Sequence, residues 1–158
     1  MTTVTQTQLP EGIDEAIAEV EEQLSLVFGR ARQIWKDAAA KIHPDLQPVG
    51  YKVLATVVRL GSTNAQAIAT VLEVDKSVVS RQVRILEEHD LVVSRADDND
   101  GRARVLSPTP GAVERVLAVR NVQQTRLREL LRSRPEEELR GFAAILHLLN
   151  EGLSGSSK

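Results

Sequence analysis

The sequence predicts a mainly α-helical fold with one small β-hairpin, and three observations lead to this prediction. Apolar residues recur at helical spacing through most of the chain. Only residues 91–106 have strand character on both sides of a polar, glycine-containing turn. Proline and glycine stand where the helices should begin and end. The chain has 158 residues, 42% of them hydrophobic, which is enough for one domain with a real core.

The first long helix is predicted over about residues 11–42. Its apolar residues alternate in spacing between four and three, which is the a/d pattern of a coiled coil. They are Ile13, Ile17, Val20, Leu24, Val27, Ala31, Ile34 and Ala38. This seam either packs within the chain or contacts a partner chain, and the pattern leaves both open. Pro44 ends the helix, because proline disfavours α conformation in the residue before it.

Three shorter helices are predicted to follow. The first begins at Pro48, with proline in its first turn, and ends before Gly61. The run Thr63-Asn64-Ala65-Gln66 matches a capping box with Thr at the N-cap, and it opens the second helix. The third helix spans about residues 75–89, and Asp75 stands at its N-cap.

The third of these helices has two different faces. Val79, Val83 and Leu86 form an apolar stripe at helical spacing. A polar stripe recurs at the same spacing, displaced by two residues, which is about 200° around the helix. Its members are Ser77, Ser80, Arg81 and Arg84. A helix held by the first face and offering hydroxyls and guanidiniums from the second can enter a DNA major groove.

A hairpin and two helices complete the prediction. Strands over residues 91–95 and 102–106 flank a turn, and Thr109-Pro110 gives an N-cap and a first-turn proline for the next helix. Ser133-Arg134-Pro135 separates that helix from the last one. We predict a single domain over residues 1–158, with a winged helix-turn-helix lobe over about 48–109. The terminal helices, about 11–42 and 110–153, are predicted to form a dimerisation unit.

Composition and motif content argue against several classes of protein. The absence of cysteine excludes a disulfide framework, a thiolate zinc site and a thiol switch. No apolar run approaches the ~18 residues that span a bilayer, and no secretory pattern opens the chain, so we expect a cytoplasmic protein without membrane contact. His43, His89 and His147 are unclustered in sequence, and no phosphate loop is present. We therefore expect no enzyme, no cofactor and no metal site, and interpret His147 and Glu151 as a surface pair.

The distribution of charge singles out candidate DNA contacts. The net charge of −2 argues mildly against nucleic acid, but residues 76–86 carry three cations and no acid. Arg81 and Arg84 are candidates for base contacts, because arginine binds guanine O6 and N7 bidentately. Lys76, in the first turn, is a candidate for phosphate contact. Ser77 and Ser80 are candidates for phosphate or base contact, or are ordinary surface serines.

Weaker candidates for DNA contact lie outside this helix. Asn64 and Gln66 begin the preceding helix and are candidates for phosphate contact. Arg102 is a candidate for a narrow minor groove, with Arg104 beside it, and a solvated loop is the alternative. Arg95 serves either the phosphate backbone or the acids of the hairpin, and the sequence does not decide between them.

Three rings are candidates for a ligand site. Trp35, His43 and Tyr51 lie near the junction of the first long helix and the predicted lobe. Aromatic rings with one hydrogen-bonding tip suit a small aromatic acid. Ordinary packing is the alternative explanation.

The order of these elements, together with several short motifs, resembles the MarR family of bacterial transcription regulators. The motifs are Ser80-Arg81, Leu86-Glu87-Glu88, Leu91-Val92, Arg95 and Asp100-Gly101-Arg102-Ala103, and the likeness covers about residues 13–153. The resemblance implies a homodimer that binds a palindromic operator in double-stranded DNA. It also implies that a small, often aromatic or phenolic, ligand releases a repressor of this kind. Asp100 would orient Arg102 through a salt bridge.

Two positions depart from the family pattern. Asp90 stands where the family usually has glycine, and we expect the helix cap to survive because aspartate tolerates the left-handed conformation. Pro108 replaces the leucine that usually precedes Thr109. Two other classes of function stay open: a winged-helix module that binds proteins without DNA, and a helical carrier of small molecules.

Overall fold

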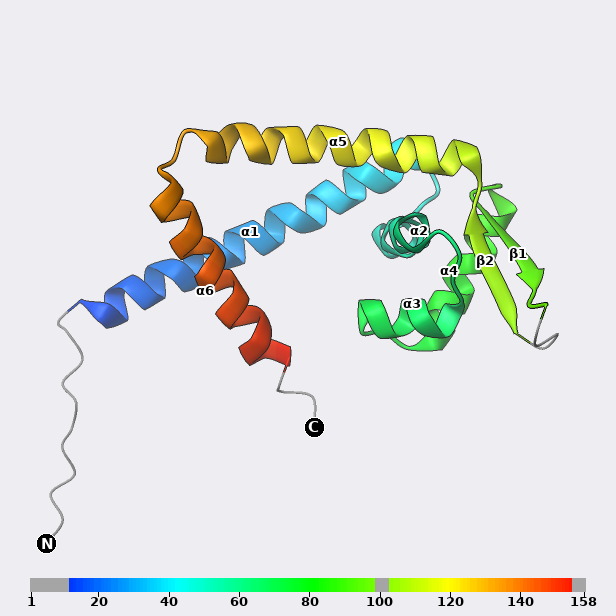
Figure 1. Ribbon diagram of the computed structural model, residues 1–158, viewed down its shortest axis with the longest axis horizontal. Helices are drawn as coiled ribbons and strands as arrows, with labels where there is room; N and C mark the ends of the chain where they lie inside the picture. Colours follow the sequence, from blue (N-terminus) through cyan, green and yellow to red (C-terminus); the bar gives the residue numbers. More distant parts are fainter. Residues whose placement is uncertain (1–11, 99–102, 155–158) are drawn as a thin grey trace, which may run out of the picture. The chain divides into compact units, whose positions relative to one another are not determined.

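The computed structural model describes residues 12–98 and 103–154, which form six helices and one two-stranded sheet (Figure 1). The predicted fold class, mainly α with one β-hairpin, is confirmed. The chain divides into two compact units, Met1–Val113 and Glu114–Lys158, and the division falls within α5. The elements are α1 (Ile13–Ile42), α2 (Pro48–Leu60), α3 (Ala65–Leu72), α4 (Lys76–Glu88), β1 (Val92–Ala96), β2 (Arg104–Pro108), α5 (Pro110–Arg132) and α6 (Glu136–Ser154).

The core of the first unit is built around α2. This helix has the predicted bounds, with Pro48 at its start and Gly61 after its end, where φ is 75°. Its side chains Val53, Leu54 and Val57 are fully buried. Because α2 packs against α1, α3, α4 and β2, it holds the other elements of the unit together.

Only the C-terminal end of α1 belongs to this core. Ala38, Ala39 and Ile42 are buried, and α1 packs against α2. Further toward the N-terminus, Ile17 and Val27 of the predicted seam are 49% and 55% exposed. The seam therefore remains largely open to solvent in the single chain.

The helix α3 begins one residue later than the predicted capping box requires. Asn64, not Thr63, is the N-cap, and its Oδ1 accepts a hydrogen bond from the N–H of Ala67 at 2.9 Å. Thr63 is instead bonded to Leu106 of β2 through both of its backbone groups, at 3.0 and 2.7 Å. Gln66 consequently stands at the second helical position and cannot complete a capping box.

After the C-terminal end of both α3 and α4, a residue other than glycine adopts the left-handed backbone conformation. Glu73 has φ 53° and Asp90 has φ 54°. After α4, the N–H of Leu91 donates to the carbonyl of Leu86 at 2.8 Å, the bond that characterises a Schellman motif. The cap that was expected at Asp90 is therefore present. Asp75 is the N-cap of α4 as predicted, although its carboxylate makes no capping hydrogen bond within the described residues.

The hairpin is attached to the core at two points. Its strands pair antiparallel, shifted by one or two residues from the predicted bounds, and the bridge from Thr63 to Leu106 joins β2 to the start of α3. At the other end, the hydroxyl of Thr109 donates to the carbonyl of Asp90 at 2.9 Å and accepts from the N–H of Ala112 at 3.3 Å. Thr109 thus caps α5 as predicted and ties its start to the end of α4.

The helices α2 and α4 approach each other closely at Gly50. A Cβ atom at this position would lie 2.6 Å from Cδ1 of Leu46 and 2.9 Å from Oε1 of Gln82. Gln82 lies on the inward face of α4 and is 8% exposed, and its Oε1 has no hydrogen-bond partner among the described residues. A glycine on α2 therefore makes room for a buried amide on α4.

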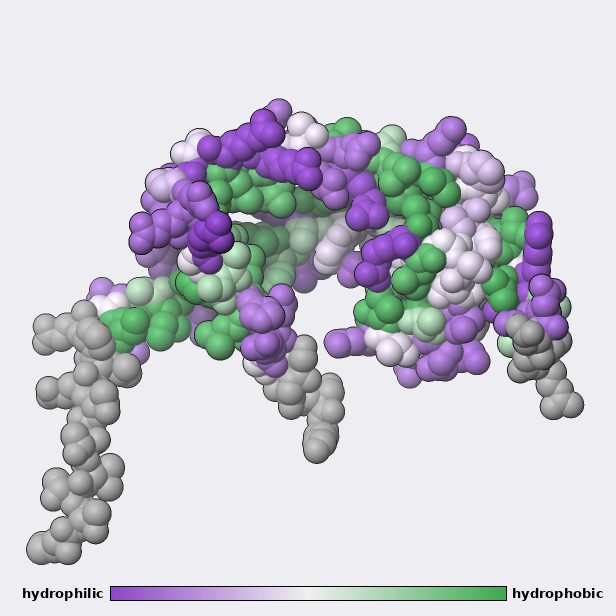
Figure 2. All heavy atoms as spheres, viewed as in Figure 1, coloured by the Kyte–Doolittle hydropathy of each residue, from purple (hydrophilic) through white to green (hydrophobic). Residues whose placement is uncertain are grey.

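The second unit consists of the rest of α5 and of α6. Hydrophobic side chains remain at its surface, and Figure 2 shows them along α5. His147 and Glu151 form an exposed pair one turn apart on α6, as expected, with Nε2 3.2 Å from Oε1. None of the described helices has both the length and the apolar character needed to cross a membrane.

We predict that Glu73→Gly raises the free energy of unfolding by about 1 kcal/mol. The left-handed conformation costs a residue with a Cβ atom about 1–2 kcal/mol, and part of this gain is lost to the greater freedom of glycine in the unfolded chain. Urea titration of both proteins measures the difference. Glu73→Ala removes the same charge but keeps a Cβ atom, so it should not stabilise the protein. Equal stabilisation by both variants would contradict the explanation.

Candidate nucleic-acid interface

The two predicted faces of α4 are confirmed by the burial of its side chains. Val79 and Leu86 are fully buried and Val83 is 8% exposed. The residues of the polar stripe and the first-turn lysine are all exposed: Lys76, Ser77, Ser80, Arg81 and Arg84. The helix is therefore anchored by one side and presents hydroxyls and cations from the other, as major-groove readout requires.

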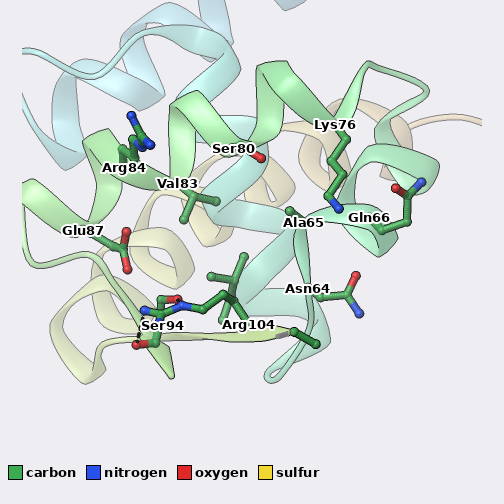
Figure 3. A pocket seen from close by; sticks show the side chains of 12 residues that line it. Asn64, Ala65, Gln66, Lys76, Ser80, Val83, Arg84, Glu87, Ser94 and Arg104 are labelled. Atoms are coloured by element: carbon green, nitrogen blue, oxygen red, sulfur yellow. Dashed lines mark hydrogen bonds between the residues drawn. The ribbon is translucent and has the colours of Figure 1, made fainter. Parts of the chain in front are cut away.

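A groove runs beside α4, between this helix, the start of α3 and the hairpin. It encloses about 590 Å³. Lys76, Ser80 and Arg84 line it from α4 at intervals of one turn, and Asn64 and Gln66 line it from the start of α3 (Figure 3). Together with Arg104 of the hairpin, the structure thus brings together six of the predicted contacts. Arg81 and Ser77 lie on the exposed side of α4 but do not line this groove.

The opposite wall of the groove comes from the hairpin. Arg104 lines it, and its guanidinium is held in place by Ser94 on the neighbouring strand. Nε donates to Oγ of Ser94 at 2.7 Å, and Nη2 donates to the Ser94 carbonyl at 3.0 Å (Figure 3). Arg104 remains exposed, so the bonds orient this cation without removing it from solvent.

Two polar residues of the groove, Glu87 and Ser94, were not identified as contacts from the sequence. Glu87 extends from α4 toward Ser94 and Arg104 on the hairpin (Figure 3). The position of Glu87, one turn after Arg84, indicates its place in the groove, since residues 76, 80, 84 and 87 share one side of a helix. Ser94 carries no comparable signal, because its role depends on the pairing of the two strands.

The structure describes only some of the other predicted DNA contacts. Asp100 and Arg102, predicted at the hairpin tip, lie outside the described residues. Arg95 is exposed on β1. Asn64 lines the groove, but its side-chain oxygen is already used to cap α3.

The three ring residues predicted to bind a ligand do not line one cavity together. Trp35 lines a second cavity of about 600 Å³, whose walls are largely apolar. Nζ of Lys52 stands 3.6 Å from the centre of the Trp35 ring. Tyr51 is 5% exposed in the core, and His43 stacks against His89. Neither is among the residues that line this cavity. Arg32 lines it and was not predicted.

Comparisons with known proteins agree with this geometry. A model of the MarR family matches residues 46–103. The HTH-type transcriptional regulator YxaD of Bacillus subtilis is 24% identical over 132 residues, which are 84% of this chain and 91% of that protein. The crystal structure of YusO from Bacillus subtilis matches with a TM-score of 0.61 and 26% identity, over 88% of this chain and 97% of that one.

A DNA-bound structure also shares the fold. Streptococcus pneumoniae FabT, in complex with DNA, matches with a TM-score of 0.80 at 14% identity, over 87% of this chain and 97% of that one. The hairpin, the helix pair α3–α4 and the exposed basic side of α4 define a winged helix-turn-helix protein of the DNA-binding class. Over residues 46–103 the chain resembles the MarR family of transcriptional regulators, and its likeness to solved structures of this fold extends over most of its length.

Proposed function

We propose that the chain is a homodimeric, sequence-specific repressor in the cytoplasm, which binds a palindromic operator and is released by a small aromatic acid. The observation that carries the proposal is the exposure of Arg81 and Arg84 on a helix whose other side is buried. Each subunit would place α4 in a major groove, and the two grooves lie about one helical turn, ~34–36 Å, apart.

A mobility shift at two salt concentrations tests the central part of this proposal. The probe is the intergenic DNA upstream of the chain's own gene, and random duplex of equal length is the comparison. Saturable binding by a species of dimer mass, tighter on the upstream DNA, is expected. Absence of binding at low salt would favour a protein-interaction module, and binding of aromatic acids alone would favour a carrier.

Arg84→Ala is expected to weaken binding to the operator about tenfold or more, and binding to random duplex much less. A bidentate base contact contributes about 1–3 kcal/mol of discrimination, which random DNA does not provide. Fluorescence anisotropy with both duplexes measures the two losses. Arg140→Ala, which removes an exposed arginine from α6, should change neither affinity. Equal losses on both duplexes would make Arg84 a phosphate contact instead.

Lys76→Ala is expected to act on salt dependence rather than on specificity. A cation that neutralises one phosphate contributes about one unit to the slope of log K against log salt. Lys76 lies in the first turn of α4 and in the groove, where a phosphate would also meet the positive helix end. Operator titrations across a series of salt concentrations measure the slope, and an unchanged slope would refute the assignment.

The dimer is supported by apolar side chains that the single chain leaves at its surface. On α1, Val20 is 50% exposed, and on α5 Leu127 and Leu130 are 57% and 72% exposed. On α6, Phe142 is 51% exposed. Covering a large apolar side chain completely contributes about 1.5–3 kcal/mol, so a second copy that covers these helices gains a substantial free energy.

Phe142→Asp is therefore expected to convert the dimer to a monomer, since the interface would have to bury an unpaired carboxylate. Sedimentation equilibrium measures the mass of each variant. Arg140→Asp introduces the same side chain on α6 and loses only an exposed ion pair with Glu136, which is worth little, so it should remain dimeric. A wild-type chain that stays monomeric at high concentration would overturn the proposed dimer.

The cavity lined by Trp35 is the proposed site for the releasing ligand. Its apolar walls, which include Phe28 and Leu72, suit an aromatic ring. Arg32 and Lys52 line the same cavity and supply the positive charge that a carboxylate needs. An acid bound there would touch α1, α2 and the turn after α3, and would lower DNA affinity only if it binds the free form more tightly than the DNA-bound form.

Benzoate is expected to change the fluorescence of Trp35, which is the only tryptophan of the chain. Benzyl alcohol, with the same ring and no charge, should bind at least about tenfold more weakly, since a charge-assisted hydrogen bond contributes about 1.5–3 kcal/mol. Lys52→Met should abolish this preference for the acid, whereas Lys41→Met, at an exposed lysine near the end of α1, should keep it. Equal binding of both probes to the wild type would contradict the site.

A further inference from the structure

Two histidines that are distant in sequence meet in the first unit. The rings of His43 and His89 are stacked, with centroids 3.8 Å apart and planes inclined by 27°. Asp45 lies beside them, with its Oδ2 3.9 Å from Nδ1 of His43. One ligand atom from each of the three residues can be chosen so that all lie within 4.8 Å of one another. Two imidazoles and a carboxylate thus gather at one point of the surface.

Both histidines stand at helix C-termini, where the backbone favours a cation. His43 is the C-cap of α1, and its N–H donates to the carbonyl of Ala39. His89 is the C-cap of α4, and its N–H donates to the carbonyl of Ile85 at 3.2 Å. Each C-terminus carries about half a negative charge from the aligned peptide dipoles. The carboxylate of Asp45 adds to this potential.

We propose that His43, Asp45 and His89 form a binding site for a divalent transition-metal ion of the zinc class. Two nitrogens and one carboxylate oxygen are a donor set that zinc uses, with a fourth position left for water. Imidazole favours zinc, nickel or copper, whereas magnesium and calcium prefer oxygen ligands. The site is separate from the groove and from the cavity of Trp35, and its test does not depend on DNA binding.

Metal binding requires only local movement of side chains. Bonds of about 2.0–2.1 Å in tetrahedral geometry separate ligand atoms by about 3.4 Å, so the three ligand atoms must close by an ångström or so. Asp45, whose side chain is 76% exposed, and His43, at 28%, have room to move. The nitrogen lone pairs lie in the ring planes, so the two rings must turn out of their stack to point at one ion. The bound ion would then link the end of α4 to the end of α1.

Zinc titration of the untagged full chain, in competition with a chromophoric chelator, tests the site. We expect one ion per chain and a rise in melting temperature, with no response to magnesium. His89→Gln and Asp45→Asn should each weaken zinc binding at least about tenfold. Loss of a residue that only orients a metal ligand already lowers metal affinity about tenfold or more, and loss of the ligand itself should lower it at least as much. His147→Gln is the matched control, because it removes the only other histidine and should leave zinc binding unchanged.

Histidine NMR spectra provide a second readout that does not rely on the variants. On zinc addition the ring signals of His43 and His89 should shift together, while those of His147 stay in place. Should His89→Gln fail to fold, His43→Gln and Asp45→Asn carry the comparison. The proposal is overturned if the wild type binds no zinc, or if His147→Gln abolishes binding and the three site variants retain it.

Discussion

The structure of the first unit depends on the burial of one side of α4. Val79 and Leu86 are fully enclosed against the core around α2, so rotation of the helix about its axis would expose them and bury charged residues instead. The close approach at Gly50 adds a steric constraint, because Gln82 occupies the space that a side chain on α2 would need. The direction in which Arg81 and Arg84 point is therefore a consequence of core packing.

The constraint extends from α4 to the hairpin through hydrogen bonds to backbone groups. The cap at Asp90 ends the helix, and the same residue accepts a hydrogen bond from Thr109 at the start of α5. On the other side, the bridge from Thr63 fixes β2 against the start of α3. The groove beside α4 thus has walls that belong to one connected network, and Arg104 is oriented within it by Ser94. These bonds fix the positions from which α4 and the hairpin present their side chains to the groove.

Local patterns in the sequence predicted most of the elements and the outward face of α4, because helical spacing and caps depend on neighbouring residues. Three features depend on pairs that are distant in sequence. The helix α3 begins one residue later than predicted, because Thr63 pairs with Leu106, which is more than forty positions away in the sequence. The buried position of Gln82 follows from its contact with α2, and periodicity of apolar residues does not reveal a buried amide. The meeting of His43 with His89 likewise requires the tertiary fold.

The overall charge of −2 does not conflict with a DNA-binding surface. At physiological ionic strength charges are screened over about 8 Å, so an acid beyond this range contributes little to the potential at α4. A phosphate beside α4 would be close to the charged side chains that line the groove. These are the cations Lys76, Arg84 and Arg104 and one acid, Glu87. A single acid among three cations reduces nonspecific attraction without reversing its sign. The attraction of such a surface for a phosphate then depends on the cations beside α4 rather than on the total charge of the chain.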